Sequence, residues 1–317
     1  MPPPDTRQAA NPPAALLAAL VVALLAGSVG LQVVRDRTRP PETARDAVLY
    51  VPSGAVLQRL ALSYDAVLAD LYWIRALLHF GGTRLAEGRP KKYEVLYPLL
   101  SIATTLDPHF NIAYRFGAFF LSEPPPGGPG RPDQAIALLE RGLAARPGKW
   151  QYMQDIGFVH YWWRRDYAEA ARWFKRAADQ PGAPWWLRSL AANTLAEGGD
   201  RRASRALWTA LAESSDNDWL RREAARRLKQ LDTLDAIDQV QAIVQRHIAR
   251  GGDVPYTWEA LVRAGLLRGV PTDATGTPLE LGPYTGRITL PETSPLWPLP
   301  SEPPPSQAAP LPGAEGQ

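Results

Sequence analysis

Cysteine is missing from the sequence altogether, and histidine is scarce. Without cysteine the chain has no disulfide bond, thiolate metal site, thiol nucleophile or lipidated N-terminal cysteine. The four histidines lie far apart, and no His-x-x-x-His or Glu-x-x-His pair offers the spacing of metal ligands on one helix. We therefore expect neither a metal site nor a cofactor. The histidines are His79, His109, His160 and His247.

The common catalytic motifs are missing as well. There is no Gly-x-x-x-x-Gly-Lys loop, no Gly-x-Ser-x-Gly elbow and no dinucleotide-binding fingerprint, so we expect no catalytic site and no small-molecule substrate. An envelope-processing enzyme remains the alternative of another class. No charge of one sign dominates, because 35 Lys and Arg residues are interleaved with 32 Asp and Glu residues. Nucleic acid is therefore not an expected partner.

Only one long apolar run occurs. Ala14 to Val34 has 21 residues without a charge, and only Ser28 and Gln32 are strongly polar. This length predicts a transmembrane signal anchor over residues 14–34. A cleaved signal peptide is the alternative, since Ala26 and Ser28 form a small-x-small site, although the apolar run continues beyond it. We expect residues 1–13 to be disordered and residues 35–48 to form a linker.

Four segments repeat one pattern of small, large apolar and turn-forming residues. A small or aliphatic residue is followed four positions later by a large or aliphatic one, three later by a small one, and then by Pro or Ser. The starts of the segments are 39, 35 and 33 residues apart. The segments are Leu96, Leu100, Ala103, Pro108; Ala135, Leu139, Gly142, Pro147; Ala170, Phe174, Ala177, Pro181; and Ala203, Leu207, Ala210, Ser215.

A second helical pattern with its own small residue precedes each of the last three segments. These small residues are Gly117, Gly157 and Ala191, and the turns are expected at residues 165–167 and 198–200. Each unit is therefore predicted to be a pair of antiparallel helices. The small residues allow the two helices to approach closely, and the Pro ends the second helix.

Together these residues resemble the tetratricopeptide repeat (TPR) family over roughly residues 56–215. The first unit departs from the family pattern at Trp73, and the third has one extra residue between Gly157 and Ala170. The resemblance implies an all-α, right-handed solenoid of helical hairpins over residues 49–216. It also implies a scaffold that holds a protein or peptide in a concave groove lined by the first helices of successive units. The side chains expected in this partner-binding groove are Asn111, Tyr114, Gln151, Gln154, Tyr161, Trp185 and Arg188.

The anchor and the repeats together resemble single-pass bacterial TPR proteins. That resemblance implies an inner (cytoplasmic) membrane protein whose repeats lie on the periplasmic or extracytoplasmic side. Arg35, Arg37 and Arg39 follow the apolar run while only Arg7 precedes it, and the positive-inside rule favours the opposite orientation. We nevertheless predict the envelope side.

The sequence after the repeats predicts three further parts. Residues 217–252 are expected to form a pair of capping helices, residues 253–290 a small hairpin-like appendage, and residues 291–317 a disordered Pro-rich tail. The appendage carries PTDATGTPLEL, which loosely resembles a stretch near the C-terminus of type II secretion pseudopilins. That resemblance makes an assembly factor of a bacterial envelope pilus or secretion machine the alternative function.

Overall fold

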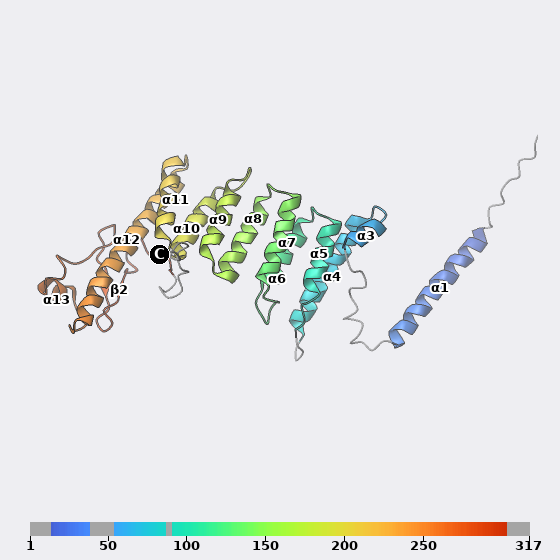
Figure 1. Cartoon of the computed structure of the whole chain (residues 1–317), viewed down its shortest axis with the longest axis horizontal. Coiled ribbons are helices and arrows are strands. Elements are labelled where there is room, and N and C mark those ends of the chain that lie inside the picture. The colour runs from blue at the N-terminus through green and yellow to red at the C-terminus, as the bar shows by residue number, and fades with distance from the viewer. Residues whose placement is uncertain (1–13, 39–53, 87–90, 303–317) are drawn as a thin grey trace, which may run out of the picture. The chain divides into compact units, whose positions relative to one another are not determined.

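The computed structural model describes residues 14–38, 54–86 and 91–302, and the chain divides into two compact units at residue 60 (Figure 1). The first unit contains α1 (Ala14–Thr38) and α3 (Gly54–Leu60). The predicted start of the linker is wrong, because residues 35–38 continue α1. The rest of the predicted linker and the predicted disordered N-terminus lie outside the described residues. Among the described helices, none is both long and apolar enough to cross a membrane.

The second unit is an array of helices, and from α4 to α12 each helix packs against the next in the chain (Figure 1). This arrangement agrees with the all-α helical array expected from the repeats. The helices are α4 (Asp65–Leu85), α5 (Leu96–Leu106), α6 (Asn111–Ser122), α7 (Pro132–Ala145), α8 (Trp150–Phe158), the π-helix η1 (Val159–Arg164), α9 (Tyr167–Ala178), α10 (Trp186–Glu197), α11 (Arg201–Ser214), α12 (Asp218–Ala249) and α13 (Trp258–Arg263).

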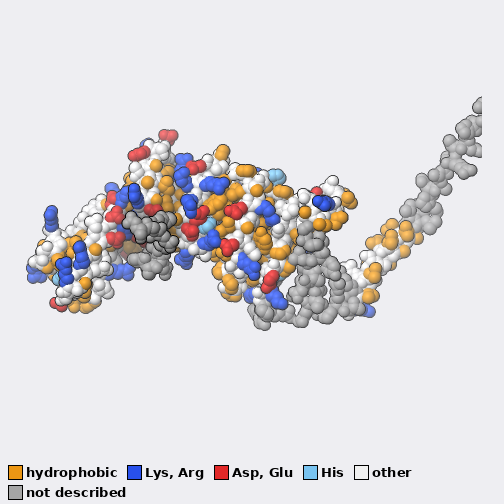
Figure 2. All heavy atoms as spheres, in the orientation of Figure 1, with side chains coloured by type: hydrophobic (Ala, Val, Ile, Leu, Met, Phe, Trp, Pro, Cys, Tyr) orange, Lys and Arg blue, Asp and Glu red, His pale blue; other side chains and the backbone are white. Residues whose placement is uncertain are grey.

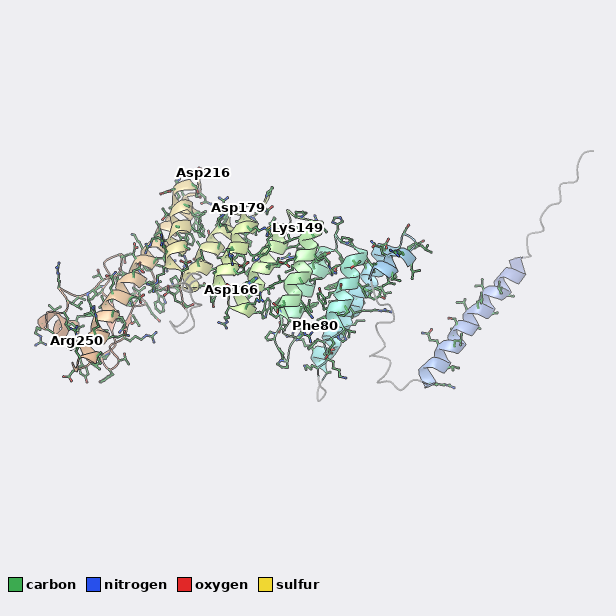
Figure 3. The ribbon with its side chains drawn as sticks, in the orientation of Figure 1. Phe80, Lys149, Asp166, Asp179, Asp216 and Arg250 are labelled. Atoms are coloured by element: carbon green, nitrogen blue, oxygen red, sulfur yellow. The ribbon has the colours of Figure 1, made fainter. Side chains whose placement is uncertain are left out.

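The turns alternate between two edges of the array, as helical hairpins require. Lys149, Asp179 and Asp216, which lie between successive units, are at one edge in Figure 3, and Asp166, which lies within a unit, is at the other. Asp166 also starts α9, because its carboxylate accepts a hydrogen bond from the backbone N–H of Glu169. Such a cap satisfies a donor that the first turn of a helix leaves free.

Glycines lie where paired helices approach most closely. A Cβ on Gly117 would come within 2.9 Å of the Leu100 side chain, and a Cβ on Gly157 would overlap the ring of Phe174. The sequence pattern assigned Phe174 to the seam with Gly157, and Phe174 is fully buried there, so this predicted seam is confirmed. Gly117 meets Leu138 of α7, its predicted partner helix, and also Leu100 of α5 in the preceding unit, a contact that the pattern did not predict.

The predicted pair of capping helices is wrong. A single helix, α12, runs for 32 residues. No Gly or Pro interrupts it, and Asp232 and Asp235 in its middle form ion pairs with Arg205 of α11, so the helix has no reason to break there. It ends where predicted, with Gly251 at a positive φ of 86°.

The appendage contains the predicted hairpin, and it extends further than expected. Strand β1 (Glu280–Leu281) pairs antiparallel with β2 (Ile288–Thr289). The prediction of disorder from residue 291 is wrong up to residue 302, because Leu296 is buried and the Gln230 amide of α12 donates to the carbonyls of Leu296 and Pro298 at 2.7 Å each. Residues 303–317 lie outside the described residues.

Asp273 links the turn at residues 273–277 of the appendage to the C-terminal segment through hydrogen bonds. Its Oδ1 accepts hydrogen bonds from the backbone N–H groups of Thr275 and Thr277, and its Oδ2 accepts one from the hydroxyl of Ser294 at 2.5 Å. Burial works against the charged carboxylate, and the hydrogen bonds outweigh it, so the pKa of Asp273 lies below its ordinary value. The stretch that resembles a pseudopilin motif is thus a turn with a structural role here.

Candidate functional site

The extra residue of the third unit is accommodated in the π-helix η1. Gly157 and Ala170 are thirteen positions apart, whereas the equivalent Ala191 and Ala203 are twelve apart. The helix absorbs the difference by widening over Val159–Arg164 and ends at Arg165, whose φ is +55°. A single π turn inside an α-helix changes the direction of the side chains that follow, and such turns are common at functional sites.

An apolar groove lies between α6 and the continuous helix α8–η1. It encloses about 370 Å³ and is partly open to solvent. Phe116 of α6 is 57% exposed and Trp162 of η1 is 51% exposed, which is unusual for such large apolar side chains. The lining residues are Arg115, Phe116, Ala118, Phe119, Phe120, Asp155, Phe158, Val159, Trp162 and Trp163.

Ring contacts hold the walls of this groove in place. Phe158 stacks on Trp162 with the ring centres 4.5 Å apart, and Trp163 meets Phe119 edge-on at 5.5 Å across the groove. Phe120 stacks at 4.3 Å on Phe80 of α4, which is buried. Aromatic pairs prefer stacked and edge-on geometries of this kind, so the rings that line the groove pack against neighbouring rings on the same helix, across the groove and on α4.

The polar part of the groove is one ion pair between the two helices. The Arg115 guanidinium contacts the Asp155 carboxylate through Nε to Oδ2 at 2.5 Å and Nη2 to Oδ1 at 3.0 Å. Burial raises the pKa of the Asp155 carboxyl, and the hydrogen bonds from Arg115 oppose that rise. A bidentate pair of this geometry fixes the distance between α6 and α8.

The groove belongs to the more apolar part of the array. Figure 2 shows hydrophobic side chains gathered over α5 to α8, while charged side chains are more frequent over α9 to α12. Of the described residues that line the groove, only Arg115 and Asp155 are ionisable.

None of the seven side chains predicted for the groove lines this one. Tyr114 is 1% exposed, packs on Tyr152 and donates its hydroxyl hydrogen to the carbonyl of Thr104, so its predicted place in the groove is wrong. Asn111 and Gln151 are half-buried at the starts of α6 and α8. Gln154 is also half-buried.

The remaining three predicted side chains lie on or beyond the third unit. Tyr161 of η1 is half-buried and its hydroxyl donates to the carboxylate of Glu197. Trp185 is exposed as predicted, and its ring meets Trp219 edge-on at 5.5 Å. Arg188 is exposed and lies 3.7 Å from the carboxylate of Asp179. These residues do not form one strip with the aromatic groove.

The aromatic residues of the groove were missed by the sequence interpretation. The signals were present: the FGAFF stretch, the adjacent pair Trp162-Trp163, and the extra residue in the third unit. One tryptophan of the pair was expected to be exposed, and Trp162 is. The predicted groove residues followed the helix register of typical TPR units. The π-helix at Val159–Arg164 departs from that register.

No protein-family model matches the sequence, and no curated protein sequence matches it. Within residues 14–38, 54–86 and 91–302, no group of three or more His, Asp or Glu side chains is placed to hold a metal ion. His160, the most enclosed of the four histidines, is buried at the start of η1, and burial lowers its pKa.

Proposed function

We propose that this chain is a scaffold of the TPR type that holds a segment of a partner protein in the aromatic groove between α6 and α8–η1. The observation that carries the proposal is the exposure of Phe116, Phe119 and Trp162 on rigid walls around a 370 Å³ groove. A folded protein rarely leaves three such side chains together in contact with water. Covering them with a partner removes apolar area at roughly 25 cal/mol per Å².

The groove favours a segment that presents apolar or proline side chains. Aromatic-lined grooves bind extended proline-rich segments by packing the flat proline rings between aromatic faces. The Arg115–Asp155 pair beside these faces satisfies its own charges, which leaves the aromatic walls as the main contact surface. Interface energy usually concentrates in a few such aromatic residues.

We also propose that residues 14–34 tether the array to the inner membrane, with the repeats on the envelope side. The support is the uncharged run in the sequence, whose first five side chains, at positions 14–18, lie outside the described ones. A tether would keep the groove close to partners in or near the membrane.

The proposal is tested by photo-cross-linking from the groove in cells. A benzoyl-phenylalanine in place of Phe119 should give a discrete adduct with a partner, and the same group in place of the exposed Tyr284 should not. Adding Trp162→Ala should remove the adduct while the melting temperature stays close to that of the parent. Equal adducts from both positions, or an adduct that persists in the Trp162→Ala protein, would show that the groove is not the binding surface.

A further inference from the structure

The outer face of α4 is an apolar stripe that no other described helix of the second unit covers. Its side chains recur at alternating spacings of four and three residues. The Val, Leu and Ile side chains of the stripe are exposed, with Leu78 and Leu85 at 70% and 80%, while Gly81 is half-buried. The stripe consists of Val67, Leu71, Ile74, Leu78, Gly81 and Leu85.

This face lies opposite the one that packs into the array. Ala69, Tyr72, Ala76 and Phe80 are the buried residues of α4. α4 is the first helix of the second unit, and the terminal helix of a repeat array normally shows a polar outer face, because no further repeat covers it. An uncovered aliphatic stripe at this place therefore needs a partner.

The spacing of the stripe specifies the shape of that partner. Alternation of four and three residues is the a/d pattern by which two helices pack along their length. At 100° per residue the stripe is roughly 80° wide, with Asp70 on one side and Arg75 on the other. Leu77, which is also exposed, lies beyond Asp70 and widens the apolar face to about 120°. The charged Asp70 within this face and Arg75 at its edge favour a partner helix that can pair them over a membrane surface, where unpaired charges are costly. A Cβ on Gly81 would meet open space, so a partner helix can approach there.

The two charged residues that border the stripe favour a second copy of α4. The seven positions of such a repeat are labelled a to g, and here Leu71 and Leu78 are at position a while Val67 and Ile74 are at position d. Asp70, directly before Leu71, is therefore at position g, and Arg75, directly after Ile74, is at position e. Neither makes an ion pair with any described residue, although Arg75 lies over the ring of Tyr72. In a parallel pair of identical helices, position g of one copy lies beside position e of the next heptad of the other. Asp70 of each copy would then meet Arg75 of the other, twice by symmetry.

We propose that two copies of this chain associate through their α4 helices in a parallel, in-register pair. An antiparallel pair sets g beside g and e beside e, so Asp70 would not meet Arg75. The contact leaves the aromatic groove of each copy free, because the groove is lined by α6, α8 and η1.

Cysteine cross-linking tests the pair directly, because the chain has no cysteine of its own. Full-length Leu71→Cys and Leu78→Cys proteins are oxidised with copper phenanthroline in the fraction of lysed cells that holds the chain. In a parallel, in-register pair, Leu71 of one copy faces Leu71 of the other, and Leu78 faces Leu78. Both proteins should therefore run on a non-reducing gel as a dimer of twice 34.8 kDa. Ala66→Cys, which is exposed on α4 about 100° from the centre of the stripe, is the matched control and should stay monomeric.

Three results would overturn the proposal. They are the absence of dimer from both seam positions, equal dimer from Ala66→Cys, and a dimer that forms only when Leu78→Cys protein is mixed with Ile74→Cys protein. The last result indicates an antiparallel pair, in which an a position faces a d position of the other copy. A charge swap gives a second readout in the Leu78→Cys background. Asp70→Arg alone should lower dimer yield on the order of fivefold, and adding Arg75→Asp should restore it. If adding Arg75→Asp to the Asp70→Arg protein does not restore the dimer yield, the predicted Asp70–Arg75 contact is contradicted.

Discussion

Glycine in the middle of three helices lets a neighbouring side chain pack directly against helix backbone. Gly117 of α6 receives Leu100 and Leu138, Gly142 of α7 receives rings of two tyrosines, and Gly157 of α8 receives Phe174. Each contact joins residues from different helices. The separation of the helices in these units therefore depends on the missing side chain at these positions.

Replacing Gly157 by Leu should destabilise the fold by about 2 kcal/mol or more, because the new side chain overlaps the ring of Phe174 and forces the helices apart. The measurement is the free energy of unfolding from denaturant titration. Gly148→Leu is the control, since a Cβ there meets only the Gln180 side chain at 3.8 Å. Equal stability of both variants would mean that Gly157 does not lie in a helix seam.

At the scale of single residues, the sequence predicted residues packed between helices better than it predicted which residues face solvent in a groove. The pairing of Gly157 with Phe174 was located correctly, because close packing against a helix backbone leaves few choices of residue type. Tyr114 was misplaced because tyrosine suits both a core and a groove. It has a large apolar ring, and its hydroxyl finds the carbonyl of Thr104 inside the protein.

Among the elements, η1 and α12 depart most from a regular repeat. The extra residue between Gly157 and Ala170 is accommodated in the π-helix. The repeat spacing revealed this extra residue, but it did not indicate that a π-helix would form. The long α12 was predicted as two helices from its apolar periodicity. The ion pairs of Arg201 and Arg205 with Asp235 join it to α11 at the point where a break was expected, and such long-range contacts cannot be read from local pattern.

The C-terminal segment should stabilise α12. A chain ending at Leu290 loses the two carbonyls that accept from the buried Gln230 amide, and it loses the buried Leu296 side chain. A typical hydrogen bond contributes about 0.5–1.5 kcal/mol, so with the loss of the buried Leu296 side chain the unfolding free energy should fall by at least about 1 kcal/mol. A chain ending at Glu302 keeps these contacts and is the control. Hydrogen exchange in the middle of α12 that is equal in the two chains would contradict this role.

At the scale of the whole molecule, the helical class and the order of the units followed from the repeats alone. Hydrophobic spacing and turn residues set both, and neither depends on distant contacts. The extent of the C-terminal part did not follow, because proline-rich sequence is compatible both with disorder and with the packed segment at residues 291–302. The tether and its orientation rest on sequence.

Alkaline phosphatase, which is active only outside the cytoplasm, fused after Gln317 should be active if the array lies on the envelope side. The chain should also resist carbonate extraction from membranes, because residues 14–34 would hold it there. The same fusion lacking residues 1–48 is the control and should be inactive and soluble. An inactive reporter on a stable full-length fusion would place the array in the cytoplasm, as Arg35, Arg37 and Arg39 favour.

The central claim is that the aromatic groove binds a protein segment, and titration calorimetry with the segment identified by cross-linking tests it most directly. Phe116→Ala with Trp162→Ala should weaken binding by roughly 2–4 kcal/mol, because aromatic residues of this kind carry most of the interface energy. Trp219→Ala removes an exposed tryptophan outside the groove and should leave affinity unchanged. The melting temperature of each protein is recorded in parallel. Undiminished affinity in the doubly substituted protein would contradict the claim.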